Sequence, residues 1–223
     1  MELDTIQVAT LLSLAESEVR NLARSGKLPH LDLEGPLRFN RQAILEWALS
    51  RGHPLAFALD EVEPTDLPPL RDLFIPKHFY YDTPGDTFAE ILRAGLDAFK
   101  LPPEADKELL HDLLVSREKL MTTALGEGLA LPHLRVPLVV NVPKPTLGVF
   151  FTRKPIDMGA LDGKPVHTLF LLLTHTPKQH LELLARLAFL FRRPDFVRLL
   201  RDRAKPASII EFINENAVGG KSK

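Results

Sequence analysis

Residues 166–174 read Val-His-Thr-Leu-Phe-Leu-Leu-Leu-Thr and contain the longest apolar run of the chain. A strand that is apolar on both faces is typical of a central strand covered by helices on either side. Helices that begin at prolines are expected directly after it, over residues 177–192, 194–201 and 206–214. This combination predicts an α/β fold in which a mixed β-sheet is flanked by helices.

The preceding stretch carries weaker signals for the same architecture. Helices are expected over residues 86–99 and 103–120, and strands over residues 79–81, 138–142 and 147–152. Together with the central strand they complete one α/β domain of ordinary size.

A smaller unit at the start of the chain has a different pattern. An apolar face over residues 6–12 and a second helix over 18–24 are followed by a hairpin over 28–39, and Asn40 then caps a third helix. Helix, turn, helix, hairpin and helix is the order of a small winged helix-turn-helix DNA-binding domain.

The composition between these two units changes sharply, because prolines alternate there with acidic residues. We therefore divide the chain into a first unit over residues 1–53, a proline-rich acidic linker over 54–73, the α/β domain over 74–216 and a tail over 217–223.

Composition excludes several kinds of chemistry. The 223 residues include no Cys, which removes disulfides, thiolate zinc sites and cysteine nucleophiles. Twenty-eight basic residues balance 29 acidic ones, so the molecule as a whole has no electrostatic attraction for nucleic acid. No apolar run approaches the length of a membrane span, and the N-terminus lacks the pattern of an export signal. We expect a cytoplasmic protein without membrane insertion and without a cofactor.

Two histidines are the best candidates for covalent chemistry. His133 follows a Gly-x-Gly segment, a short apolar strand and a proline, which hold the direction of the ring. His180 falls in the first turn of a helix predicted to begin with the capping sequence Thr176-Pro177-Lys178-Gln179, where the positive helix terminus attracts anions. A positioned neutral imidazole can accept a phosphoryl group, although either ring could instead be structural.

A metal site is a weaker hypothesis. It would use His167, His175 and His180, with Asp162 as a further ligand. Their spacing matches no usual ligand pair, since the strand positions lack the i, i+4 helical arrangement. We expect no metal site from the sequence.

Residues 117–133 read Arg-Glu-Lys-Leu-Met-Thr-Thr-Ala-Leu-Gly-Glu-Gly-Leu-Ala-Leu-Pro-His. The stretch resembles the signature of the type-2 enzyme IIA domains of the bacterial phosphoenolpyruvate-dependent phosphotransferase system, which has the same distance between Arg and His. Residues 156–173 and 180–185 resemble the nitrogen-regulatory (PtsN-like) branch most closely. The resemblance covers residues 74–214.

This resemblance implies a fold, a reaction and partners. It implies that His133 is phosphorylated, that His180 contacts the phosphoryl group and that Arg117 and Thr123 support it. The implied donor is a small histidine phosphocarrier protein of the HPr or NPr type, and the implied further partner is a regulatory target or an enzyme IIB. Three positions depart mildly from the signature: Thr122, Ala124 and Leu134.

The first unit resembles excisionase-like and MerR-like helix-turn-helix domains. If it binds DNA, the residues expected to face it are Ser17, Glu18, Arg20, Asn21, Arg24 and Arg38. However, the unit holds six basic and seven acidic residues and so carries a net charge of −1, which opposes tight binding to DNA.

Three functions remain open from the sequence. The first is a histidine phosphocarrier acting mainly in regulation, as part of a phosphotransferase pathway. The second is a DNA-binding transcriptional regulator whose enzyme IIA domain senses its phosphorylation state. The third is an α/β domain in which both histidines are structural and the first unit binds only protein. The missing membrane and enzyme IIB segments favour regulation over sugar transport.

Overall fold

A five-stranded mixed sheet forms the centre of the larger domain. The computed structural model describes residues 2–31, 35–51, 53, 67–101, 105–134, 142, 144–174 and 176–216. The strands of the sheet are β3 (Phe79–Thr83), β4 (Ala124–Gly126), β5 (Leu129–Ala130), β6 (Thr146–Ile156) and β7 (Val166–Leu173). They lie in the order β3-β6-β7-β5-β4. The β6–β7 and β4–β5 pairs are antiparallel, whereas β3–β6 and β5–β7 are parallel, so the mixed sheet is confirmed.

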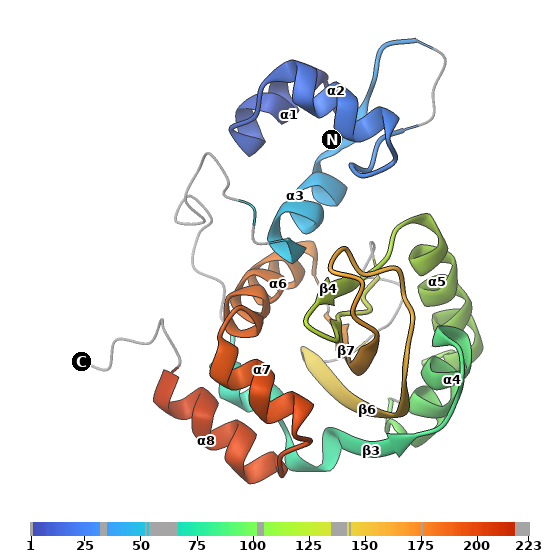
Figure 1. Ribbon diagram of the computed structural model, residues 1–223, viewed down its shortest axis with the longest axis vertical. Helices are drawn as coiled ribbons and strands as arrows, with labels where there is room; N and C mark the ends of the chain where they lie inside the picture. Colours follow the sequence, from blue (N-terminus) through green and yellow to red (C-terminus); the bar gives the residue numbers. More distant parts are fainter. Residues whose placement is uncertain are drawn as a thin grey trace.

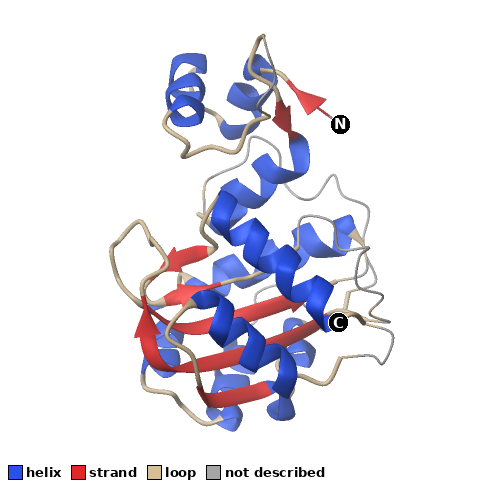
Figure 2. Ribbon diagram, turned by 90° about the vertical axis from the view of Figure 1, so that its right-hand side faces the viewer, coloured by secondary structure: helices blue, strands red, loops and turns tan. Residues whose placement is uncertain are grey.

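Helices cover both faces of this sheet (Figures 1 and 2). They are α4 (Phe88–Ala98), α5 (Lys107–Leu120), α6 (Pro177–Phe191), α7 (Pro194–Arg201) and α8 (Pro206–Asn216), with short 3₁₀ turns at Leu70–Leu73 and Pro76–His78. In β7, Phe170 and Leu172 pack in the core under α6, α7 and α8, whereas Leu169 and Leu171 pack in the core under α4 and α5. This alternation confirms that β7 is a central strand buried on both faces.

Local capping residues set the starts of the helices. The Thr176 side chain accepts a hydrogen bond from the Gln179 amide at the start of α6, where Pro177 occupies the first helical position. Thr87 and Asp106 cap α4 and α5 in the same way. Helices α4 and α5 therefore begin a few residues later than the sequence pattern predicts. Each cap side chain accepts a hydrogen bond from the backbone amide three residues further along the chain, and this bond sets where the helix begins.

The N-terminal domain is a small helical unit with its own core. It contains β1 (Glu2–Leu3), α1 (Thr5–Leu12), α2 (Glu16–Arg24), β2 (Phe39–Asn40) and α3 (Arg41–Ser50). The predicted Asn40 cap of α3 is confirmed by the hydrogen bond from the Ala43 amide. An antiparallel bridge joins Leu31 to Arg38, as the predicted hairpin requires, and Phe39 also pairs with Leu3 of β1. Residues 32–34 of the predicted hairpin lie outside the described residues.

The two domains touch through α3. Figure 1 shows α3 reaching from the N-terminal domain to the near end of α6, and the two helices are in contact. Met121, just after α5, and Leu181 of α6 pack against the core of the N-terminal domain. The third helix of the small domain therefore packs on the start of α6, beside the segment that follows α5.

Some sequence predictions lie outside the described residues. These are the linker over 54–66, most of the strand expected over 138–142, His175 and the tail over 217–223. Among the residues that are described, no helix is both long enough and apolar enough to cross a bilayer.

Candidate active site

His133 lies at the end of the short segment that follows β5. The carbonyl of Pro132, its neighbour, accepts a hydrogen bond from the Leu172 amide of β7, which ties this segment to the centre of the sheet. The Nδ1 atom of His133 lies 2.7 Å from the Leu131 carbonyl oxygen. A carbonyl can only accept, so Nδ1 carries a proton and donates it there. Nε2 is the ring nitrogen left for chemistry.

His180 lies in the first turn of α6, as the capping pattern predicts. Its amide donates to the Thr176 carbonyl, and its Nδ1 atom lies 3.2 Å from the Thr174 hydroxyl. The ring centroids of His180 and His133 are 5.1 Å apart. Both side chains are almost fully buried, with 1% and 2% of the residue exposed. The structure thus brings together two histidines that are 47 positions apart in the chain.

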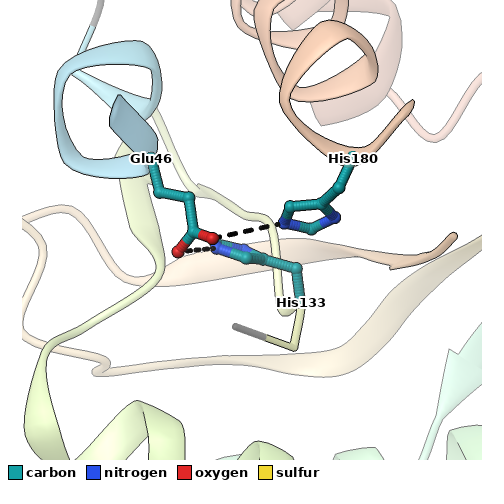
Figure 3. A group of neighbouring side chains, drawn as sticks. All are labelled: Glu46, His133 and His180. Carbon is teal, nitrogen blue, oxygen red and sulfur yellow. Dashed lines mark ion pairs between the residues drawn. The ribbon is translucent and has the colours of Figure 1, made fainter. Parts of the chain in front are cut away.

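The surprising member of this site is Glu46, which comes from α3 of the other domain. Figure 3 shows its carboxylate facing both rings. One carboxylate oxygen lies 3.4 Å from His133 Nε2, and the other lies 3.7 Å from His180 Nε2. Only 2% of Glu46 is exposed. An acidic side chain of the helix-turn-helix domain is therefore buried against both histidines.

Arg117 and Thr123 line a small cavity next to Glu46 and His133. A cavity of about 10 Å³ is bordered by Arg117, Thr123 and His133 from the larger domain and by Glu46 and Trp47 from α3. This volume holds about one water molecule. One Arg117 guanidinium nitrogen donates to the Met121 carbonyl at 2.6 Å. The four predicted site residues of the larger domain are thus grouped beneath α3, in a space too small for a phosphoryl group.

Burial and charge set the protonation states of two side chains. Burial lowers the pKa of His180 to about 3, and nearby His133 acts in the same direction. Burial alone would raise the pKa of Glu46, but its contacts with His133, and then the nearby His180 and Arg117, bring the net pKa below the usual value. At neutral pH His180 is therefore neutral and Glu46 is ionised.

The family of the larger domain follows from comparison with known proteins. A family model described as "Phosphoenolpyruvate-dependent sugar phosphotransferase system, EIIA 2" matches residues 86–216, which is more than half of the chain. The chain belongs to this EIIA type-2 family. Its Arg117, His133 and His180 all lie within the matched region.

The sequence of this EIIA domain is similar to those of proteins named as nitrogen regulatory proteins. The chain is 35% identical to the "Nitrogen regulatory protein" of Pseudomonas aeruginosa over 153 residues, which are 67% of this chain and 94% of the relative. It is 29% identical to the "PTS system fructose-specific EIIABC component" of Bacillus subtilis over 50% of this chain, but it spans only 17% of that protein. The crystal structure of the nitrogen regulatory protein IIA-Ntr from Neisseria meningitidis has a TM-score of 0.57 and 25% identity, covering 65% of this chain and 98% of that one.

The N-terminal domain matches a second family model, "Helix-turn-helix domain", over residues 2–52. The side chains expected to face DNA are all exposed: Ser17, Glu18, Arg20, Asn21, Arg24 and Arg38. Arg20 forms an ion pair with Glu16 one turn earlier in α2. Docking of α3 on the EIIA domain leaves this surface uncovered.

Sequence reasoning did not identify Glu46 as a site residue. Its only local signal is a single charge between apolar residues in α3, where Ala43, Ile44, Leu45 and Trp47 are all buried. An acidic residue surrounded by buried neighbours needs a partner, because an isolated buried carboxylate is costly. No local sequence pattern indicates that the partners of Glu46 are histidines of another domain.

The lowered pKa of His180 predicts a pH dependence of stability. Between pH 7 and 5 the unfolded chain protonates this histidine, at its ordinary pKa near 6.5, while the folded protein does not. Stability should therefore fall as the pH falls, by about 2 kcal/mol at pH 5 from His180 alone. Urea unfolding at pH 7, 6 and 5 measures this loss.

A His180→Asn variant is the control for that measurement. Its free energy of unfolding should depend less on pH than that of the parent. His78 and His167 also have lowered pKa values because of burial, and they remain in both proteins, so the difference between the two slopes isolates His180. Equal slopes would contradict the expectation.

Proposed function

We propose that the chain accepts a phosphoryl group on Nε2 of His133 from a small histidine phosphocarrier protein, as a nitrogen-regulatory type of EIIA. The observation that carries the proposal is the grouping of His133, His180 and Arg117, with Nδ1 of His133 held by the Leu131 carbonyl and Nε2 directed into the site. Its relatives named as nitrogen regulatory proteins support the regulatory branch.

The proposed transfer needs no proton to leave His133. The Nε2 lone pair forms a bond to phosphorus while the bond between phosphorus and the carrier's imidazole nitrogen breaks, and that nitrogen keeps the electron pair. The Nδ1 proton stays directed at the Leu131 carbonyl throughout. Arg117 and the N-terminus of α6 stabilise the negative charge on the transferring oxygens.

Labelling tests this proposal. The full chain is incubated with radiolabelled phosphoenolpyruvate, the general phosphotransferase enzyme and the histidine phosphocarrier protein. We expect one phosphoryl group per chain, labile in acid and stable in base. A chain that gains no label, or gains an acid-stable label, would overturn the proposal.

A second function, regulation through the helix-turn-helix domain, is favoured by the position of Glu46. A phosphoryl group on His133 Nε2 adds a charge of about −1.5 to −2 where the Glu46 carboxylate now lies. Repulsion and lack of space both oppose α3 docking on the phosphorylated domain. We infer that phosphorylation releases the helix-turn-helix domain and thereby signals to DNA or to a protein target.

DNA binding by that domain predicts a dependence on salt. If α2 contacts phosphates, the affinity for duplex DNA should fall steeply with salt, and an Arg20→Ala/Arg24→Ala variant should reduce the slope of log K against log salt by about 2. Gel-shift titrations of the phosphorylated and unphosphorylated chain measure both quantities. Arg153→Ala, an exposed change in β6, is the matched control. Binding that is absent at low salt, or unaffected by the double variant, would exclude this role.

A further inference from the structure

Glu46, His133 and His180 share a feature that phosphoryl transfer does not explain. Both carboxylate oxygens of Glu46 and the Nε2 atoms of both histidines are buried without a hydrogen-bond partner among the described residues. Buried polar atoms are rarely left unsatisfied, and four in one place indicate something that binds all of them. We propose that these three side chains hold a Zn²⁺ ion that joins the helix-turn-helix domain to the EIIA domain.

The distances fit ligands around one ion better than hydrogen bonds. Charge-assisted hydrogen bonds from nitrogen to a carboxylate are about 2.7–2.9 Å long. The two contacts of Glu46 are 3.4 and 3.7 Å, and the ligand atoms of all three residues lie within 4.8 Å of one another. Two ligands bonded to zinc at about 2.05 Å in a tetrahedral arrangement lie about 3.4 Å apart. The two contacts of Glu46 are thus close to the spacing of two ligands of one zinc ion.

The second nitrogen of each ring is held as it is in zinc sites. Nδ1 of His133 donates to the Leu131 carbonyl, and Nδ1 of His180 lies at the Thr174 hydroxyl. In protein zinc sites the histidine ligands are oriented by a hydrogen bond of the other ring nitrogen. Both Nε2 atoms therefore face the carboxylate of Glu46, where a bound cation would be coordinated by all three side chains.

The donor set selects the kind of ion. Two imidazole nitrogens and one carboxylate oxygen are a common zinc set in proteins, with a fourth position left for water. Oxygen-seeking ions such as Mg²⁺ and Ca²⁺ are disfavoured by the two nitrogens. The small cavity beside Glu46 and His133 offers room for that water. Arg117 also brings positive charge to this site, as its effects on the pKa values of Glu46 and His180 indicate. Because this charge repels a cation, the affinity for the ion must come from direct coordination by the three side chains.

Zinc bound in this way would be coordinated by Nε2 of His133, the same atom that would carry the phosphoryl group. The inference rests on the docking of α3 that the proposed function invokes, but not on phosphoryl transfer itself. Zinc would hold the docked form and occupy His133 Nε2, so metal and phosphoryl group would exclude each other. The site departs from the sequence-based metal hypothesis, since His167 bonds to the Thr168 hydroxyl and is not part of the cluster.

The test is a zinc titration of the metal-free full chain against a chromophoric chelator at pH 7.5. We expect one Zn²⁺ per chain. Glu46→Gln, His133→Ala and His180→Ala should each weaken zinc binding by about 100-fold or more. Glu211→Gln on the exposed side of α8 and His30→Ala in the N-terminal domain are matched controls and should bind as the parent does. Circular dichroism checks that each variant is folded.

Trp47 supplies a second readout, because it is the only tryptophan and lines the cavity beside Glu46. Its emission should shift on adding zinc to the parent and not to Glu46→Gln. No binding by the parent would overturn the proposal. Equal affinity of parent and Glu46→Gln would also overturn it, because the ion would then sit on the EIIA domain alone. The titration uses no phosphoryl donor, so failure of the labelling experiment is a separate result.

Discussion

His133→Ala is expected to reduce phosphoryl incorporation by about 1000-fold or more, because it removes the only nucleophile that the proposed transfer uses. The chain has no Cys, and His180 has its Nδ1 atom beside the Thr174 hydroxyl and a pKa lowered to about 3. The measurement is the initial rate of labelling from the phosphorylated carrier protein. Circular dichroism and urea unfolding of the variant check that the buried cavity left by the ring has not unfolded the domain.

His180→Ala separates the two histidines in the same assay. We expect it to retain the label and to slow transfer by about 100-fold, because it removes a group that contacts the phosphoryl oxygens and not the acceptor. If His133→Ala labels as fast as the parent while His180→Ala does not label, the two roles are exchanged and the assignment is wrong.

Glu46→Ala is expected to change the same rate in the opposite direction. The carrier must reach Nε2 of His133, which is 2% exposed beneath α3. The apparent rate is therefore reduced by the fraction of molecules in which α3 is docked. Removing the carboxylate takes away its contacts with both histidines, and we expect labelling to accelerate by about tenfold or more, equivalent to about 1.4 kcal/mol of docking free energy.

Control measurements show whether faster labelling of Glu46→Ala is caused by the release of α3. Glu211→Gln removes one negative charge far from α3 and should label at the parental rate. Trp47 emission should show that Glu46→Ala exposes the tryptophan more than the parent does. A rate equal to or below that of the parent would mean that α3 does not restrict access to His133.

Local patterns account for much of the fold. Proline and threonine at the start of α6 predict its first turn, because a cap accepts from an amide only three residues away. The apolar run of β7 predicts a strand buried on both faces, because side-chain direction alternates with every residue. Pairing was less predictable: Phe39 lies beside Leu3, and no property of either residue names the other as its partner.

The residues of the candidate site also differ in how far the sequence alone predicts them. Arg117, Thr123, His133 and His180 belong to motifs within one domain, so the local patterns around the two histidines and the resemblance of these motifs to the EIIA signature are enough to predict them as site residues. Glu46 lies in another domain, across a linker, and it reaches the two histidines only because α3 packs on α6. Sequence alone thus identified an EIIA domain, a candidate phosphoryl-accepting histidine within it and a helix-turn-helix domain. That the partner covers the histidine depends on a contact between distant surfaces, and such contacts arise from shape and charge in three dimensions.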